Sequence, residues 1–377
     1  MGVSFRLSRL RRVICKSLFL KRALQVLARY LTDAIRRGAS DIHLLADCHP
    51  TMRLHGQLLE IDNTLLEDSD LSAELISICP ITKRIALEEQ RSCDFSHELQ
   101  IEGDTRRLRV NLYYADGKLS AAFRVIPSTI PDWSWAGFPV ALGQRLLLQT
   151  DGLVIITGAT GAGKSTTLAM LTNSLNQRGG YRIISIEEPI EYRYPKVPRS
   201  VVSQREVGVD VVSFAEGLRS GLRQDPDVIV VGEIRDTETA QMALSAAETG
   251  HLVLATMHTR DAKGAISRYA DFFSLETQRD MRNQFAMSLR AIVSQRLLPD
   301  EIEGEKRHLA IEVLWNTNPI FSAIRNNKLE SIDNYLLTGR DDGMISFDES
   351  VRSLYRDGKI TREVAESNVR ELSYLNR

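Results

Sequence analysis

Leu153-Val-Ile-Ile-Thr-Gly158-Ala-Thr-Gly161-Ala-Gly163-Lys164-Ser165-Thr166 is the stretch of this chain that decides its fold. Its first residues are apolar or β-branched and predict a buried strand, and a helical pattern follows from Thr166. The residues between fit G-x-x-x-x-G-K-[ST], whose fixed places are filled by Gly158, Gly163, Lys164 and Ser165. In this order, glycines let backbone N–H groups close around phosphate oxygens, and the helix N-terminus adds partial positive charge. The stretch therefore predicts a strand, a phosphate-binding loop and a helix.

Such a loop is typical of proteins that bind ATP together with Mg²⁺. Lys164 is expected to reach the β- and γ-phosphates, and the Ser165 hydroxyl is expected to ligate Mg²⁺. The residues expected to contact the nucleotide through this loop are Gly158, Ala159, Thr160, Gly161, Ala162, Gly163, Lys164, Ser165 and Thr166. An ordinary strand–turn–helix is the alternative, and the agreement of the motif with its flanking strand and helix argues against it.

The composition indicates a globular chain of two domains. It has 377 residues, of which 43% are apolar, enough for real hydrophobic cores. Lys and Arg number 48 against 49 Asp and Glu, so the overall charge does not indicate nucleic acid as a partner. The four cysteines are scattered without a C-x-x-C pair, which fits a reducing cytosol and predicts no zinc site. No run approaches the roughly 20 apolar residues of a membrane span.

Four segments follow from composition and periodicity. Residues 1–22 form a basic extension, interpreted as a solvated arm or as an arm that touches anionic lipid or a partner. Residues 23–125 predict a small α+β domain, which includes a hairpin turning at Asp116-Gly117. Residues 126–145 are rich in proline and predict a linker. Residues 146–377 predict the domain that carries the phosphate-binding loop.

The second domain alternates strands with helices. After the loop, strands are expected at 182–186, 228–233 and 251–258, with helices at 213–223 and 240–249. This alternation predicts an α/β fold with a mostly parallel sheet and helices on both faces. Polar residues at the strand ends then collect at the carboxyl edge, where such sheets bind ligands. From about residue 275 onward, the pattern predicts mostly helices.

Two strand-end acids are candidates for the chemistry. Glu233 ends a strand in the usual Walker B place, and Gly232 stands before it where many phosphate-loop proteins have an Asp that associates with Mg²⁺. Glu233 is therefore expected to be the metal-associated acid. Glu191 follows the preceding strand and could polarise an attacking water. One strand-end Glu is more often structural, but two of them downstream of a phosphate-binding loop favour catalysis.

Together these motifs give a family resemblance that covers roughly Gly38 to the C-terminus. The chain resembles the secretion ATPases of type II and type IV systems, and most of all the type IV pilus retraction (twitching motility) ATPases. The matching stretches are Ala39-Ser-Asp-Ile-His, Arg109-Val-Asn, Phe123-Arg-Val-Ile-Pro-Ser, the Walker A loop, the "Asp box" Ile186-Glu-Glu-Pro-Ile-Glu, Leu222-Arg-Gln-Asp-Pro-Asp through Glu233, Ala246-Ala-Glu-Thr-Gly-His, Met257-His-Thr, Ser294-Gln-Arg-Leu-Leu-Pro and Leu337-Thr-Gly-Arg-Asp-Asp-Gly-Met.

The resemblance implies a PAS-like N-terminal domain and a RecA-like ATPase domain with C-terminal helices. It also implies a cytoplasmic homohexamer, peripherally associated with the inner membrane, that uses ATP and Mg²⁺ to work on pilins through an inner-membrane platform protein. By this match Glu191 is the catalytic base, Glu233 is the Walker B acid, and His251 and His258 sense nucleotide. Arg109 and Arg124 match the N-terminal arginines that complete the site.

Departures from the family pattern bear on the direction of work. The Asp box has Glu188 where the family usually has Asp, which keeps the charge and changes the reach. The retraction motif A-I-R-N-L-I-R-E falls on residues 319–326, which keep little of it. The four-cysteine zinc insert usual in assembly-type relatives does not occur, which argues against an assembly or type II motor.

Other functions stay open at this point. A type IVB secretion or conjugation ATPase is related and also lacks the zinc insert. A nucleic-acid motor on the same core would need basic, aromatic-bearing loops, for which the balanced charge gives no support. A subunit that binds nucleotide without hydrolysis is disfavoured by the complete set of Lys164, Ser165, Glu191 and Glu233.

Overall fold

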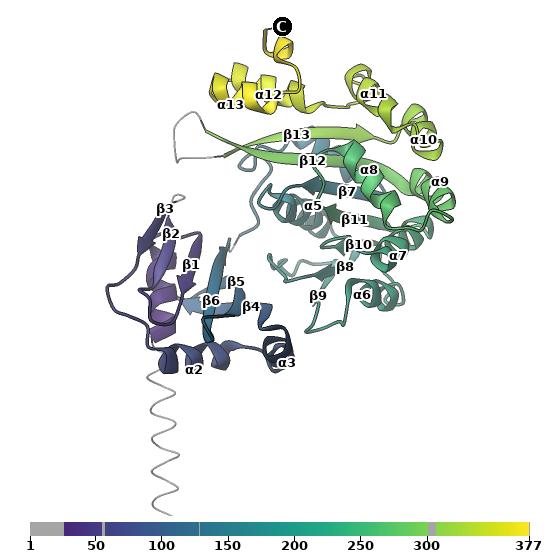
Figure 1. Cartoon of the computed structure of the whole chain (residues 1–377). Coiled ribbons are helices and arrows are strands. Elements are labelled where there is room, and N and C mark those ends of the chain that lie inside the picture. The colour runs from purple at the N-terminus through teal and green to yellow at the C-terminus, as the bar shows by residue number, and fades with distance from the viewer. Residues whose placement is uncertain (1–25, 55–56, 128, 301–306, 377) are drawn as a thin grey trace, which may run out of the picture. The chain divides into compact units, whose positions relative to one another are not determined.

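The computed structural model describes residues 26–54, 57–127, 129–300 and 307–376, which belong to two units, Met1–Ser128 and Thr129–Arg377 (Figure 1). Each unit has its own hydrophobic core. The basic extension predicted for residues 1–22 lies outside the described residues.

The first unit is an antiparallel sheet packed against helices. The sheet order is β3-β2-β1-β6-β5-β4. Its strands are β1 (Asp41–Leu44), β2 (Thr51–Leu54), β3 (Gln57–Glu60), β4 (Ser92–Ile101), β5 (Asp104–Ala115) and β6 (Lys118–Ile126). Residues 26–36 are helical, followed along the chain by α2 (Asp68–Ile78) and α3 (Ile81–Gln90). The predicted hairpin is confirmed, because Ala115 pairs with Lys118 across Asp116 and Gly117, which both have positive φ.

The second unit is built on a seven-stranded sheet of order β13-β12-β7-β11-β10-β8-β9. Its strands are β7 (Gly152–Gly158), β8 (Arg182–Glu187), β9 (Val201–Glu206), β10 (Val228–Val231), β11 (Leu252–Met257), β12 (Leu289–Pro299) and β13 (Arg307–Trp315). All neighbouring strands are parallel except β12 and β13. The predicted α/β class with a mostly parallel sheet is thus confirmed. The buried runs of β7, β10 and β11 explain it, since a parallel sheet covered on both faces needs continuous apolar strands.

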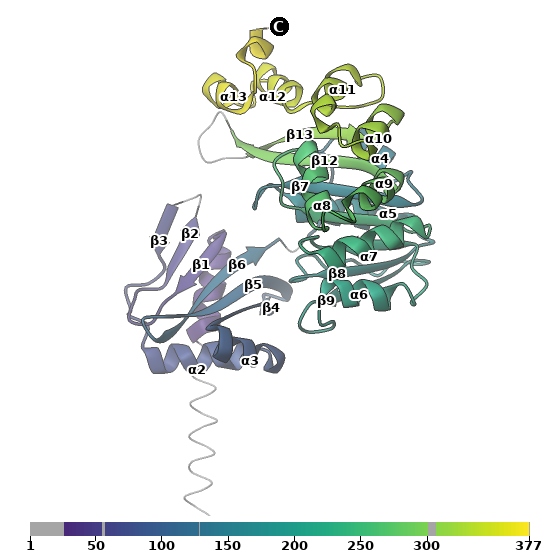
Figure 2. The ribbon, with the colours of Figure 1, turned by 45° about the vertical axis from the view of Figure 1, so that its right-hand side comes forward.

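Helices cover both faces of this sheet, as Figures 1 and 2 show. On one face α5 (Lys164–Arg178) packs against β7 and β11. On the other face lie α6 (Phe214–Gly221), α7 (Thr237–Glu248), α8 (Ala262–Asp271) and α9 (Gln278–Ser288). Four further helices follow β13: α10 (Asn318–Arg325), α11 (Ile332–Thr338), α12 (Phe347–Arg356) and α13 (Arg362–Asn368).

Two segments differ from the sequence-based expectation. The described part of the chain after residue 275 holds five α-helices, but it also holds β12 and β13, a long antiparallel pair that the sequence pattern did not predict. The apolar run 291–293 is compatible with a helix by periodicity alone, but here it lies fully buried between β7 and β13, where β-branched residues pack well. Part of the segment 126–145 is also structured. It contains α4 (Val140–Leu146), whose Leu142 and Leu146 are buried in the core of the second unit.

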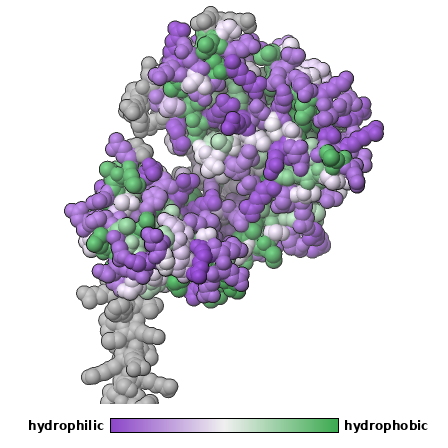
Figure 3. All heavy atoms as spheres, viewed as in Figure 1, coloured by the Kyte–Doolittle hydropathy of each residue, from purple (hydrophilic) through white to green (hydrophobic). Residues whose placement is uncertain are grey.

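No helix among the described residues combines the length and the apolar character needed to cross a membrane. On the face drawn in Figure 3 the described surface is mainly hydrophilic, with small scattered hydrophobic spots.

A buried carboxyl group lies under the start of α8. Glu312 of β13 is 2% exposed, and its Oε1 accepts a hydrogen bond from the Ala262 backbone N–H at 2.8 Å. Burial raises the pKa of Glu312 from its ordinary 4.5 to about 7, although the Ala262 N–H and the positive charge of Arg370 favour the ionised form. The native state therefore holds a proton at Glu312 between these pH values, whereas the unfolded chain has released it. This group's contribution to stability is fully present below pH 4.5 and is lost as the pH rises through 7.

We expect Glu312→Gln to remove this pH dependence. The amide oxygen can still accept the bond from Ala262, and the neutral amide never has to be buried as a charge. The variant should gain stability relative to the wild type as the pH rises from 5 to 8, by up to roughly 3 kcal/mol. Urea unfolding of both proteins at the two pH values measures this gain, with exposed Glu276→Gln as the control. An equal stability difference at pH 5 and pH 8 would contradict the assignment.

Candidate functional site

The phosphate-binding loop has the backbone shape that its glycines predict. Gly158, Gly161 and Gly163 have φ of +153°, +79° and +86°, a region that side chains disfavour. A Cβ on Gly158 would lie 2.5 Å from the Gln295 carbonyl oxygen of the neighbouring β12, so glycine is required there. Gly163 is the N-cap of α5, and the Ser165 side chain just after it is exposed. The loop therefore leads into a helix N-terminus with an accessible hydroxyl.

Lys164 lies folded back into this loop. It is 7% exposed, and its Nζ donates to the carbonyl oxygens of Gly158 and Ala159 at 2.9 and 3.0 Å. Burial lowers the pKa of Lys164, and the negative charges of Glu233 and Glu191 oppose that shift. Both predicted acids thus lie close enough to act on the lysine charge. The structure brings Lys164, Glu191 and Glu233 together at the carboxyl edge of the sheet, as the strand order requires.

His258 lies between the lysine and one of the acids. Its Nδ1 is 3.4 Å from Lys164 Nζ, and its Nε2 is 3.6 Å from Glu233 Oε1. Burial and the nearby Lys164 charge lower the pKa of His258, with Glu233 opposing. The imidazole is therefore held neutral near pH 7 and can respond to charge on either side. The nucleotide-sensing role that the resemblance implies for His258 stays a prediction.

His251 lies elsewhere in the same unit. It precedes β11, and its carbonyl oxygen accepts from Gly152 N at the start of β7. Its Nδ1 is 3.0 Å from both the Ala246 carbonyl oxygen and the Thr249 hydroxyl at the end of α7. The six residues of β11 separate it from His258, a distance of about 23 Å along the strand. Within one chain, His251 therefore belongs to the edge of the sheet opposite the phosphate-binding loop.

Arg109 and Arg124 lie on the first unit. Arg109 is on β5 and Arg124 is on β6, and the two residues pair directly across these strands. Arg124 Nε donates to Asp41 Oδ1 at 2.9 Å, and Arg109 Nε is 3.7 Å from Asp94 Oδ1. Both side chains are substantially exposed, at 58% and 40%. Such surface ion pairs are weak, so either guanidinium can exchange its partner for phosphate at little cost.

Several residues that organise the site were missed at the sequence level. The Thr157 hydroxyl, at the end of β7, lies 2.9 Å from the Thr259 carbonyl oxygen and accepts from Thr259 N at 2.9 Å, which fixes the segment after His258. Arg235 forms an ion pair with Glu188 at 2.7 Å and joins the loops after β8 and β10. The local sequence pattern does not predict these contacts, because they connect segments that are far apart in sequence.

Gly232 has a steric reason to be glycine. A Cβ at this position would lie 3.1 Å from the Ile186 carbonyl oxygen and 3.2 Å from the Glu187 Cα. An Asp in this place would require the β8 backbone to shift by a few tenths of an ångström. Glu233, the acid that follows, stays the predicted Walker B carboxylate.

The residues present fit ATP with Mg²⁺. Positive-φ glycines, a buried lysine and an exposed Ser165 hydroxyl at the start of α5 suit a triphosphate. In the described part of the chain, no group of three His, Cys, Asp or Glu side chains could hold a metal ion by itself. Mg²⁺ normally uses few protein ligands and completes its shell with phosphate and water, so the two predicted ligands, Ser165 and Glu233, are compatible with Mg²⁺.

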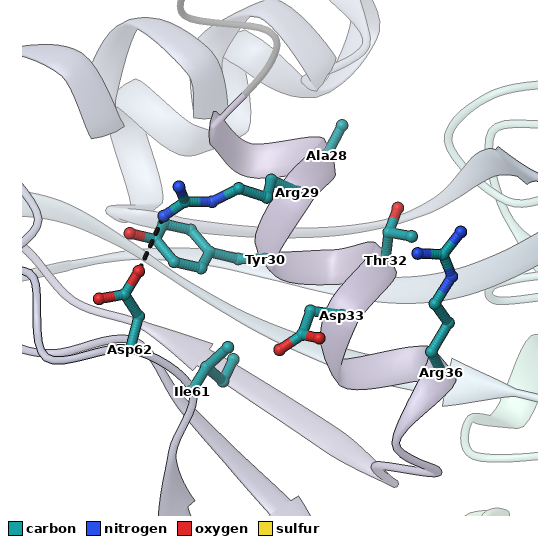
Figure 4. A pocket seen from close by; sticks show the side chains of 8 residues that line it. All are labelled: Ala28, Arg29, Tyr30, Thr32, Asp33, Arg36, Ile61 and Asp62. Atoms are coloured by element: carbon teal, nitrogen blue, oxygen red, sulfur yellow. Dashed lines mark hydrogen bonds and ion pairs between the residues drawn. The ribbon is translucent and has the colours of Figure 1, made fainter.

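A separate hollow on the first unit has a different character (Figure 4). Its volume is about 520 Å³, and it is lined by residues of the 26–36 helix together with Ile61 and Asp62. Arg29 there pairs with Asp62 at 2.9 Å, and Arg36 pairs with Glu102 at 2.5 Å. The hollow therefore carries charges of both signs, and the predicted site residues do not line it.

Comparison with known proteins shows which proteins this chain is similar to. The profile of the family "Type II/IV secretion system protein" matches residues 20–357. The type IV pilus retraction ATPase PilT of Pseudomonas aeruginosa is 38% identical over 335 residues, 89% of this chain and 95% of the relative. The crystal structure of the pilus retraction motor PilT with bound ADP superposes with a TM-score of 0.81, at 40% identity, over 93% of this chain and 98% of that one. The ATPase DotB of Legionella pneumophila superposes with a TM-score of 0.79, at 27% identity, over 91% and 95%.

Proposed function

Since this chain belongs to the type II/IV secretion system protein family, we propose that it is the motor of a type IV pilus and drives pilin disassembly during retraction. It is an ATPase, as its relatives are. The observation that carries the proposal is the convergence of Lys164, Glu191, Glu233 and His258 beside a phosphate-binding loop, in a chain that matches PilT over nearly its whole length.

The residues of the site divide the work of hydrolysis among them. The loop N–H groups and Lys164 bind the phosphates, and Ser165 and Glu233 are placed to hold Mg²⁺, which when bound offsets the charge that develops on the phosphates. Glu191 orients the attacking water and accepts its proton. His258 reports the state of the site, because a change in charge near Lys164 alters its contacts with both Lys164 and Glu233.

The assembly and its partners belong to the same proposal. The family resemblance supports a cytoplasmic homohexamer that associates peripherally with the inner membrane and acts on a platform protein there. In such a ring, we propose that Arg109 and Arg124 of the first unit complete a nucleotide site. His251 is proposed to sense nucleotide at the edge of the sheet opposite the phosphate-binding loop. The side-by-side position of the two arginines on β5 and β6 suits joint recognition of a phosphate group.

The direction of work is inferred from two features. The chain has no four-cysteine zinc insert of the kind found in assembly motors. Its segment 319–326 largely forms α10, with Pro319 in the first turn, where proline is compatible with a helix. The segment at the position of the retraction motif therefore still forms a helix, although the side chains on the helix surface differ from the motif. A type IVB secretion ATPase is the second candidate, favoured by the likeness to DotB.

Deletion of the gene tests the direction. If the chain drives retraction, the deletion strain should carry excess surface pili that fail to retract, since assembly continues without disassembly. Electron microscopy and shear-fraction pilin measurements give the count, with the wild-type gene restored as the control. Loss of pili, or of a secreted substrate, would reject retraction in favour of assembly or type IVB secretion.

A further inference from the structure

The segment that carries Glu191 is held by hydrogen bonds on both sides of that residue. Before it, Ile190 N donates to Glu206 Oε2 at 3.2 Å, and after it the Tyr192 carbonyl oxygen accepts from Gln204 Nε2 at 2.7 Å. Gln204 and Glu206 both lie on β9, two residues apart, so they project from the same face of that strand. Side chains of β9 thus hydrogen-bond to the backbone on both sides of the proposed catalytic base.

Gln204 makes three hydrogen bonds, and all three reach the segment around Glu191. Its Nε2 donates to the Tyr192 carbonyl oxygen and to Glu187 Oε1 at 3.1 Å, and its Oε1 accepts from Tyr194 N at 3.2 Å. An amide is the group that can donate twice and accept in one plane. A carboxylate in its place would face the Glu187 carboxylate and the Tyr192 carbonyl without a proton to donate.

A further contact ties the same segment to the nucleotide loop. The Tyr192 side chain is 6% exposed, and its hydroxyl lies 3.0 Å from Thr166 Oγ1 in the first turn of α5. Thr166 follows Lys164 and Ser165 directly. The position of Glu191 is therefore set relative to the phosphate-binding residues from one side and relative to the sheet from the other.

We propose that Gln204 is a positioning residue for ATP hydrolysis: its side-chain amide holds the 187–194 segment so that Glu191 is aligned with the attacking water. The inference rests on the proposed role of Glu191 as the base. Gln204 acts through Glu191 and touches neither nucleotide nor metal in this scheme. Misplacement of a catalytic group by about 1 Å can cost 10²-fold in rate, whereas binding at the loop is unaffected.

The test compares steady-state ATPase kinetics of the full-length chain with those of Gln204→Met and Gln204→Glu. Met keeps the length of the side chain and removes every hydrogen bond, and Glu keeps the acceptor and removes both donors. We expect each to lower kcat by about 10- to 100-fold, with KM for ATP within about 3-fold of wild type. Tyr192→Phe, which removes only the bond to Thr166, should show the same pattern with a smaller drop.

Ser203→Ala is the matched control. Ser203 is the preceding residue on β9, and its hydroxyl accepts from Arg182 Nη1 at 2.9 Å, away from the 187–194 segment. This variant loses one hydrogen bond on the same strand and should keep the wild-type kcat. If Ser203→Ala lowers kcat as much as Gln204→Met does, then β9 merely stabilises the sheet and the proposal is overturned.

A double variant separates positioning from a general loss of structure. Because Gln204 acts through Glu191, Gln204→Met should lower the residual kcat of Glu191→Gln by less than 2-fold. A further 10-fold loss in that background would overturn the positioning role while leaving Glu191 as the base. If Glu191→Gln alone keeps the wild-type kcat, the base assignment fails and the role of Gln204 fails with it. Thermal unfolding of each variant with ATP analogue bound shows whether the loop still binds nucleotide.

Discussion

Replacing Glu191 with Gln should lower kcat for ATP hydrolysis by about 10²- to 10⁴-fold while ATP still binds. The amide fills the same space but cannot accept a proton from water. Lys164 and the loop N–H groups, which bind the phosphates, are unchanged, and the Gln204 and Glu206 bonds around residue 191 involve only its neighbours. Phosphate release measures turnover, and fluorescent nucleotide binding measures affinity.

Glu233→Gln provides the comparison for that result. It should also lose turnover, and its residual activity should depend less on Mg²⁺, because Glu233 is the acid proposed to lie at the metal. Glu233 also contacts His258 at 3.6 Å, whereas Glu191 has no such link to the histidine among the described contacts. If Glu191→Gln hydrolyses ATP normally while Glu233→Gln is inactive, the roles of the two acids are exchanged.

Lys164→Ala should abolish measurable hydrolysis, with a loss of at least about 10²- to 10³-fold, because it removes the positive charge aimed at the phosphates. The fold should survive. Among the described residues, Nζ bonds to two loop carbonyls and approaches His258. Other residues of α5 pack into the apolar core. Circular dichroism and thermal unfolding check the fold, and exposed Lys359→Ala is the matched control. Hydrolysis near the wild-type rate would exclude the loop as the phosphate site.

The part of the fold nearest the nucleotide could be predicted from the sequence because it depends on local patterns. A buried β-branched run, a glycine loop and a helix occupy consecutive residues, and parallel strands necessarily bring their carboxyl ends to one edge. That geometry explains why Glu191, Glu233 and His258 were expected near Lys164. By the same geometry, His251 lies at the other edge of the sheet, because it precedes β11 whereas His258 follows it. The histidine motif alone does not show this difference in position.

The missed features depend on contacts between distant segments. The apolar stretch of β12 has the composition of a helix or a strand, and only its pairing between β7 and β13 decides between them. Strand β9 is an edge strand with one buried residue, so its sequence lacks a strong alternation of apolar and polar residues. Gln204 owes its role to three bonds with residues 10 to 17 positions away, a relation that no local pattern encodes.

The central claim is that ATP turnover at this site retracts a pilus. The most direct measurement follows single labelled pili in living cells that carry Glu191→Gln in the chromosomal gene, with any other retraction-motor gene deleted and the assembly-motor gene intact. Pili should extend at the wild-type frequency and then fail to retract, while cells with Ser203→Ala retract them normally. Retraction at wild-type frequency and speed in the Glu191→Gln strain would contradict the account.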